Sequence, residues 1–277
     1  MLKFLIDADT GIDDSVAIYY ALKQKDVRVV GITTSFGNTT APQGAENTLR
    51  LIKMANPGYE VPVVVGENKP LFGEWGGPEY HIHGSNGIGG VELPETDQKP
   101  LDMRAEDFII DMAREHGHEL TIITLGRMTN LALALQKEPN LPKMVKNVIF
   151  MGGTFQEHGN VLPMSEANIS GDPEAADMVF QAGFDLTMVG LDVTHKTQVT
   201  PEILRKLRKY ATPENIPFAD YIIKATDDVY FPFNRAQNNC LDRSPVHDPS
   251  ALVYATCPQL FKTVKVPARV ECKGEFT

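Results

Sequence analysis

Cysteine and basic residues are both scarce in this sequence. Only Cys240, Cys257 and Cys272 occur among 277 residues, and none has C-x-x-C spacing. This argues against a disulfide framework and favours buried thiols in a reducing compartment. Lysine and arginine number 26 against 36 acidic residues, for a formal net charge of −10. Nucleic acids and anionic membranes both require basic patches, so neither is expected as a partner.

Long apolar runs are missing as well. No stretch approaches the roughly 20 apolar residues of a membrane-spanning helix. The N-terminal MLKFLIDAD is too short and becomes charged too soon for a signal peptide. A hydrophobic content of 42% with 22% charged residues is typical of a globular protein. We therefore expect a cytoplasmic protein without a membrane partner.

Short apolar runs alternate with amphipathic segments along the first two-thirds of the chain. The runs that predict buried strands are 4–6, 27–35, 61–66, 120–126, 145–153 and 185–193. The segments that predict helices are 12–23, 42–55, 105–116, 128–137 and 173–182. Strands alternating with helices imply parallel pairing through right-handed crossovers. The prediction is an α/β fold with a doubly wound, mostly parallel open sheet of the Rossmann-like type.

Two regions depart from this alternation. Residues 67–100 are rich in Gly, Pro and His and have no period, which predicts a functional loop. From about residue 200 the pattern becomes helical, and VKVPARVECKGEF at 264–276 predicts two late strands joined by a turn. With no linker or repeat in the sequence, we expect one domain over residues 1–277.

Four aspartates crowd the first predicted strand and helix, in FLIDADTGIDDS at residues 4–15. Asp7 and Asp9 close the strand, and Asp13 and Asp14 open the helix, at the edge where ligands of such sheets bind. Crowded carboxylates raise one another's pKa unless a cation or hydrogen bonds compensate. Helix capping explains one or two of them. An EF-hand loop does not fit, because Ile18 stands where its bidentate glutamate belongs.

Two enzyme families contain similar aspartates. DADT at 7–10 resembles the D-x-D-x-[TV] motif of haloacid-dehalogenase-like, Mg²⁺-dependent phosphatases, which would make Asp7 the nucleophile and Asp9 the acid and base. The whole string D-x-D-x-G-x-D-D resembles the N-terminal signature of the nucleoside hydrolases, the inosine–uridine-preferring family. Further segments resembling that family follow in order: SFGN at 35–38, HGSNGIGG at 83–90, LGRMTNLALAL at 125–135, FMGG at 150–153, GNVLPMSEANISGDPEAA at 159–176 and VHDPSA at 246–251.

The sequence departs from the family pattern at three points. Arg127 replaces a more usual Pro or Gly, and Ala167 replaces a common Phe. The chain also stops at GEFT, where family members typically continue through a further strand and helix, so we expect it to lack the family's last C-terminal segment.

The resemblance implies a Ca²⁺-dependent ribonucleoside N-ribohydrolase that releases free base and ribose. The implied Ca²⁺ ligands are the carboxylates of Asp9, Asp14 and Asp248 and the carbonyl oxygen of Leu125. Asp9 would also be the general base. Asp7 would not bind the ion itself but would support the residues that do. The alternatives are the phosphatase and a non-catalytic ribose- or nucleoside-binding protein that keeps the metal site.

The resemblance also implies contacts with a ribonucleoside substrate. His247 would protonate a purine leaving group. The other implied substrate contacts are Asp13, Asn38, His83, Met151, Asn160, Glu166 and Asn168. Candidates for the base pocket, on a predicted helix at 227–237, are Tyr230, Phe231, Arg235 and Gln237. Base preference stays open between purines and pyrimidines, and a homo-oligomer, either a dimer or a tetramer, is expected.

Overall fold

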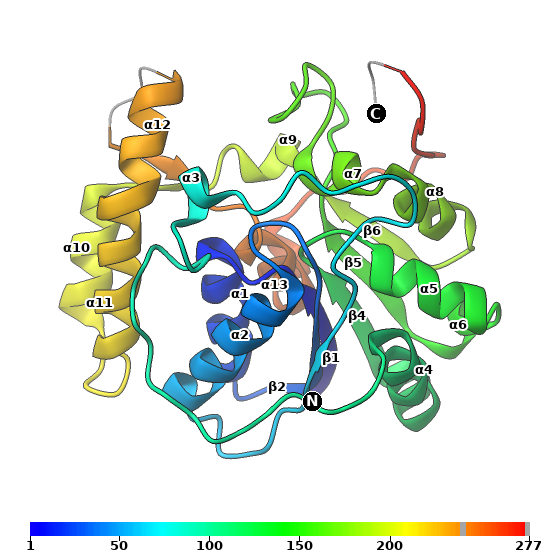
Figure 1. Ribbon diagram of the computed structural model, residues 1–277, viewed down its shortest axis with the longest axis horizontal. Coiled ribbons are helices and arrows are strands. Elements are labelled where there is room, and N and C mark those ends of the chain that lie inside the picture. Colours follow the sequence, from blue (N-terminus) through cyan, green and yellow to red (C-terminus); the bar gives the residue numbers. More distant parts are fainter. Residues whose placement is uncertain (239–241, 275–277) are drawn as a thin grey trace.

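A six-stranded parallel sheet forms the centre of the computed structural model, which describes residues 1–238 and 242–274 (Figure 1). The strand order is β3-β2-β1-β4-β5-β6. The strands are β1 (Leu2–Ala8), β2 (Val27–Thr34), β3 (Val63–Val65), β4 (Leu120–Thr124), β5 (Asn147–Met151) and β6 (Leu186–Val189). This order reverses between β1 and β4, which is the doubly wound arrangement. The predicted fold class is confirmed.

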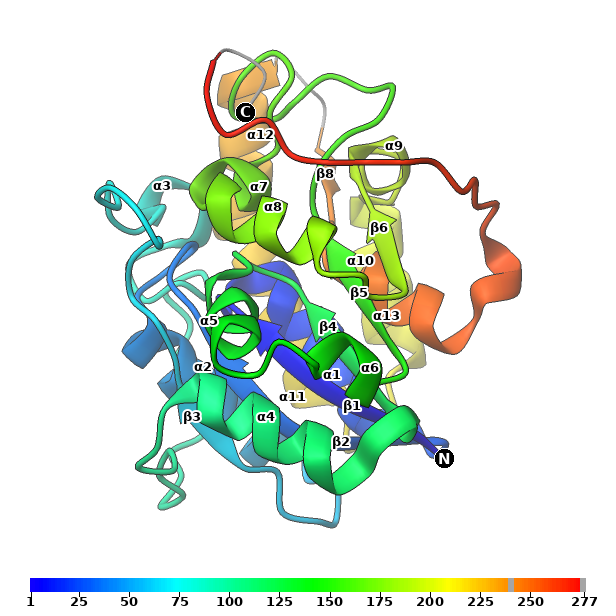
Figure 2. The ribbon, with the colours of Figure 1, turned by 90° about the vertical axis from the view of Figure 1, so that its right-hand side faces the viewer.

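Helices cover both faces of the sheet (Figures 1 and 2). Phe4, Ile6 and Ala8 of β1 join one buried cluster and Leu5 joins the other, because successive side chains point to opposite faces. On the first face lie α1 (Ile12–Lys23), α2 (Ala41–Ala55) and α13 (Pro249–Thr256). On the second lie α4 (Ala105–His116), α5 (Thr129–Lys137) and α8 (Pro173–Gln181). Burial on both faces explains why the strands read as continuous apolar runs.

The boundaries of the five helices predicted between residues 12 and 182 agree with the structure to within a residue. The start of α8 shows why: the side chain of Asp172 accepts a hydrogen bond from Ala175 N–H, and Pro173 occupies the first turn. Gly183, at φ +88°, follows the end of the helix. The capping signals in the sequence therefore placed this helix correctly.

The remaining elements are short or belong to the helical last third. The longer ones are α10 (Pro201–Tyr210), α11 (Ile216–Ala225), a π-helical turn (Thr226–Tyr230) and α12 (Phe231–Asn238). The short helices are α3 (Tyr80–His83), α6 (Leu141–Met144), α7 (Ala167–Gly171), α9 (Leu191–Thr194) and the 3₁₀ turns Gly117–Glu119 and Pro258–Leu260. Two-residue strands, β7 (Gln198–Val199) and β8 (Ser244–Pro245), pair antiparallel. None of the helices described is long and apolar enough to cross a membrane.

The two late strands predicted at 264–276 are wrong within the described residues, which reach 274. That segment forms no helix or strand and has no ladder partner among the described residues. Val264 is 75% exposed, whereas Val270 is 7% exposed and donates its N–H to Asp177 Oδ1. A strand needs a neighbouring strand for its hydrogen bonds, and this segment packs against α8 instead. Cys257 and Cys272 are free thiols but only half-buried, and Cys240 lies outside the described residues.

Candidate active site

A cavity of about 800 Å³ opens at the carboxyl edge of the sheet. It lies where the strand order reverses, so the loops after β1 and β4 form its floor. The predicted functional loop, residues 67–100, contributes Trp75, Glu79 and His83 to its wall. Predicted site residues that line the cavity are Asp9, Asp13, Asn38, His83, Leu125, Met151, Asn160, Glu166, Asn168, His247 and Asp248. The structure thus brings together residues from along almost the whole chain.

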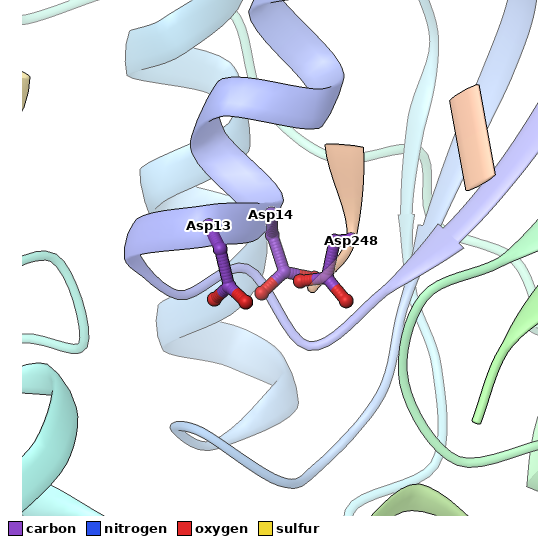
Figure 3. Close-up of side chains that lie close together, drawn as sticks. All are labelled: Asp13, Asp14 and Asp248. Atoms are coloured by element: carbon purple, nitrogen blue, oxygen red, sulfur yellow. The ribbon is translucent and has the colours of Figure 1, made fainter. Parts of the chain in front are cut away.

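Three carboxyl groups form a buried cluster beside this cavity. One oxygen from each of Asp13, Asp14 and Asp248 lies within 4.8 Å of the others, and Figure 3 shows the three groups side by side. Asp13 and Asp14 come from the first turn of α1, and Asp248 directly precedes α13. Burial, followed by the negative charges of neighbouring aspartates, raises the pKa of Asp14 and of Asp248 well above the usual range.

The hydrogen bonds of Asp14 leave one oxygen for another ligand. Its Oδ2 accepts from Gly11 N–H at 2.8 Å and from Asn38 Nδ2 at 2.9 Å. Its Oδ1 is buried and has no N–H donor among the described residues, and the neighbouring carboxyl group of Asp248 can donate to Asp14 only when it is protonated. A buried carboxylate oxygen without a partner, beside two further carboxylates, is the donor set that a hard divalent cation prefers. The cluster therefore fits a metal ion.

Asp13 differs from its two neighbours. Burial opposes ionisation, but the positive charges that His83 and His247 carry when protonated and a hydrogen bond from Tyr230 outweigh it and lower the pKa of Asp13. Tyr230 Oη donates to Asp13 Oδ1 at 2.8 Å, and the backbone N–H of His247 donates to Oδ2 at 3.2 Å. Asp13 is therefore held as a carboxylate at the cavity wall.

Asp9 lies outside the three-carboxylate group and is bound by different partners. Its Oδ2 accepts from Arg127 Nη1 at 2.5 Å and from Asn38 N–H at 2.8 Å. Burial raises the pKa of Asp9 although Arg127 opposes the rise. Asp7 does not line the cavity: its Oδ1 accepts from Thr33 Oγ1 and Asn130 Nδ2, and burial raises its pKa to about 7.

Glu166 and Asn168 organise the opposite wall. Glu166 caps α7 by accepting from Asn168 N–H and Ile169 N–H, and it also accepts from Gly153 N–H at 2.9 Å. Asn168 Nδ2 donates to the Leu125 carbonyl at 2.6 Å and to the Met151 carbonyl at 3.1 Å. These bonds join the ends of β4 and β5. Asn160 is exposed, and its Oδ1 accepts from Ala167 N–H.

Two histidines complete the acidic side of the cavity. His83 Nδ1 accepts from Ile12 N–H at 3.3 Å, and burial lowers the pKa of His83 to about 4. His247 Nδ1 lies 2.8 Å from Thr194 Oγ1. Burial also lowers the pKa of His247. Both rings are therefore neutral imidazoles at neutral pH.

The base-pocket candidates are not all at the cavity. Gln237 lines it, as does Tyr230, whose hydroxyl binds Asp13. Phe231 is 2% exposed and belongs to the core, and Arg235 pairs with Asp242 away from the cavity.

Several lining residues did not enter the predicted site, among them Trp75, His195 and Arg127. The only signals for them were that Trp75 is the single tryptophan, inside the irregular loop, and that Arg127 departs from the family pattern.

An α/β fold with a buried acidic cluster that fits a cation, at the switch point of its sheet, is typical of a class of metal-dependent enzymes. The model of one family, the inosine-uridine preferring nucleoside hydrolases, matches residues 4–277, and the chain belongs to that family. It is a hydrolase that cleaves the N-glycosidic bond of ribonucleosides, and the family is metal-dependent. Neither the phosphatase nor the non-catalytic alternative is supported.

Known proteins resemble the chain over nearly its whole length. Probable uridine nucleosidase 2 of Arabidopsis thaliana is 36% identical, over 98% of this chain and 83% of that protein. A pyrimidine-specific ribonucleoside hydrolase RihA of Klebsiella pneumoniae is 32% identical, over 100% of this chain and 86% of its own. A plant nucleoside hydrolase, the PpNRh1 enzyme, superposes with a TM-score of 0.92 at 36% identity, covering 99% of this chain and 85% of its own. A purine-preferring ribonucleoside hydrolase from Gardnerella vaginalis superposes at 0.91 and 36% identity, with coverages of 99% and 86%.

Proposed function

We propose that Asp9 is the general base of this ribonucleoside hydrolase and that Ca²⁺ is its metal. Asp14, Asp248 and the Leu125 carbonyl would hold the ion, with Asp9 completing the protein ligands. The observation that carries the proposal is the buried, unpartnered Oδ1 of Asp14 within the three-carboxylate cluster. A bound Ca²⁺ would supply positive charge that lowers the pKa of the attacking water and binds ribose hydroxyls.

The chain's own residues account for the transfer of atoms. Asp9 takes a proton from water, the water oxygen bonds to C1′ of the ribose, and the N-glycosidic bond breaks with its electron pair on the base. Asp13 accepts a hydrogen bond from a ribose hydroxyl, since Tyr230 and His247 hold it as a carboxylate. The sugar also contacts Met151, Asn160, Glu166 and Asn168 on the opposite wall.

His247 and His83 stand on the leaving-group side in this proposal. Because burial lowers the pKa of His247, it meets the departing base as a neutral N–H donor. His83 approaches the sugar or base from the irregular loop. Asn38 orients Asp9 and Asp14 by donating to both.

The proposed substrates include both purine and pyrimidine ribonucleosides. The names of similar proteins point both ways: one is a probable uridine nucleosidase, one is pyrimidine-specific and one is purine-preferring. Trp75 and Gln237, which line the cavity, are proposed to contact the base. We further propose one domain over residues 1–277 and, from the family resemblance, a dimer or tetramer, which native mass spectrometry would distinguish.

The test is ribose release from inosine, uridine, adenosine and cytidine, each with and without a Ca²⁺ chelator. We expect release from at least one purine and one pyrimidine nucleoside, loss of activity with chelator, and at least about a 10³-fold fall in kcat for Asp9→Asn. Asp26→Asn, an exposed carboxylate before β2, is the matched control and should keep full activity. Full activity in Asp9→Asn would refute the assignment of the base.

A further inference from the structure

Arg127 is a cationic side chain in the wall of an acidic cavity. Among the described residues that line the cavity, it is the only lysine or arginine. Its side chain is 8% exposed. A buried guanidinium is costly unless it is paired, so its surroundings indicate its role.

The partner of Arg127 is the carboxylate of the proposed base. Arg127 Nη1 donates to Asp9 Oδ2 at 2.5 Å, and Asn38 N–H donates to the same oxygen. Oδ2 of Asp9 accepts both hydrogen bonds, and Oδ1 of Asp9 accepts neither. Arg127 Nε is buried without a hydrogen-bond partner in the described residues, so the bond to Asp9 fixes the position of the guanidinium.

Two glycines leave the space that this side chain occupies. A Cβ at Gly37 would lie 1.8 Å from Arg127 Nη1, and a Cβ at Gly171 would lie 2.5 Å from Nε. Gly171 does not have a positive φ, so its backbone conformation does not require glycine. Its missing side chain instead leaves room for the guanidinium of Arg127. The absence of side chains at Gly37 and Gly171 therefore creates the space that the Arg127 guanidinium fills.

Arg127 also acts on a group of negative charges. Asp9 lies close enough to Asp13, Asp14 and Asp248 for its negative charge and theirs to repel each other. Four buried carboxylates repel one another strongly at low dielectric. One fixed positive charge on Asp9 reduces that repulsion before any cation binds.

We propose that Arg127 is a positioning residue that serves as a built-in cation: it holds Asp9 through Oδ2 and provides part of the charge compensation that the divalent cation otherwise provides. This inference rests on the proposed function of Asp9 and the cluster. It implies that the cation-free site is folded and that cation affinity is moderated, because the two positive charges compete for the same carboxylates. By linkage, the binding free energy that Arg127 takes from the cation equals the stability it adds to the cation-free protein minus the stability it adds to the cation-bound protein.

The test compares Arg127→Met, Arg127→Lys and wild type in the full chain, with Ca²⁺ alone as the probe. For Arg127→Met we expect the Tm in chelator to fall by about 6–15 °C, and by less than half as much in saturating Ca²⁺. Calorimetric titration should show Ca²⁺ binding about tenfold tighter or more. Arg127→Lys should lie between Arg127→Met and wild type. Arg104→Met removes an arginine paired with Glu106 and Glu67 outside the cavity, and it should leave Ca²⁺ affinity unchanged.

A second variant moves the guanidinium without removing its charge. Gly171→Ala places a methyl group against Nε, so it should also tighten Ca²⁺ binding. Equal falls in Tm with and without Ca²⁺, or unchanged or weaker Ca²⁺ binding in Arg127→Met, would overturn the proposal in favour of a packing role. Ribose release by the wild type is a separate readout, so failure of the proposed function would not be confused with failure of this inference.

Discussion

Tyr230 and Asp13 form a buried hydrogen bond at the cavity wall. Tyr230→Phe removes the hydroxyl and leaves the Asp13 carboxylate with one fewer donor. We expect the free energy of unfolding to fall by about 1.5–3 kcal/mol, the usual range for a hydrogen bond to a charged group, and kcat/KM to fall about tenfold. Urea unfolding and steady-state kinetics measure the two effects.

Tyr20→Phe is the control for this change. Tyr20 Oη bonds to Thr256 Oγ1 at 2.8 Å away from the cavity, so its loss should cost about 1 kcal/mol and leave kcat/KM unchanged. If Tyr230→Phe behaves like Tyr20→Phe in both measurements, the hydroxyl of Tyr230 does not support Asp13.

The pH dependence of stability also belongs to single residues. Burial raises the pKa of Asp7 from 3.8 to about 7, so folding favours the protonated carboxyl. The stability this contributes is fully present below about pH 4 and is lost as pH rises to about 7. In chelator, we expect the free energy of unfolding to fall by roughly 2–4 kcal/mol over this range from Asp7 alone. In Asp7→Asn the side chain cannot ionise. The free energy of unfolding of this variant, measured by urea unfolding from pH 4 to 8, should therefore fall less with pH than that of the wild type. Parallel profiles would contradict this explanation.

At the scale of elements, replacing glycine by alanine should impair catalysis at Gly11 and stabilise the protein at Gly44. A Cβ at Gly11, which precedes α1, would lie 2.5 Å from His83 Nδ1 and 2.7 Å from Asn38 Nδ2. A Cβ at Gly44 inside α2 would meet its nearest atoms at an ordinary 3.7 Å. Gly11→Ala should therefore lower kcat/KM tenfold or more, since it displaces cavity side chains. Gly44→Ala should stabilise the protein by about 0.5–1 kcal/mol with unchanged kinetics. Equal effects of the two changes on kcat/KM would show that the approach at Gly11 is not critical.

Elements with strong local signals could be predicted from the sequence. The apolar run of β1 and the Asp172–Pro173 start of α8 have causes within a few residues. The segment at 264–274 has similar apolar residues but no neighbouring strand, and only Val270 is buried there. Strand formation depends on a partner distant in sequence, which local pattern does not specify.

At the scale of the whole molecule, part of the site could be predicted from the sequence and part could not. The carboxylates could be placed together because the ends of parallel strands meet at one edge of the sheet. The pairing of Asp9 with Arg127 could not be predicted, since the residues are 118 positions apart and the bond depends on side-chain conformation. The same holds for Tyr230, whose hydroxyl reaches Asp13 from the last third of the chain.

The most direct test of the central claim is to titrate Ca²⁺ into chelator-stripped protein while measuring bound Ca²⁺ and ribose release from the same samples. The claim predicts one Ca²⁺ per chain, ribose release that rises with the same midpoint as binding, and loss of both in Asp248→Asn. Ribose release that is complete before Ca²⁺ binds, or that persists in Asp248→Asn, would contradict a reaction centred on the aspartate cluster.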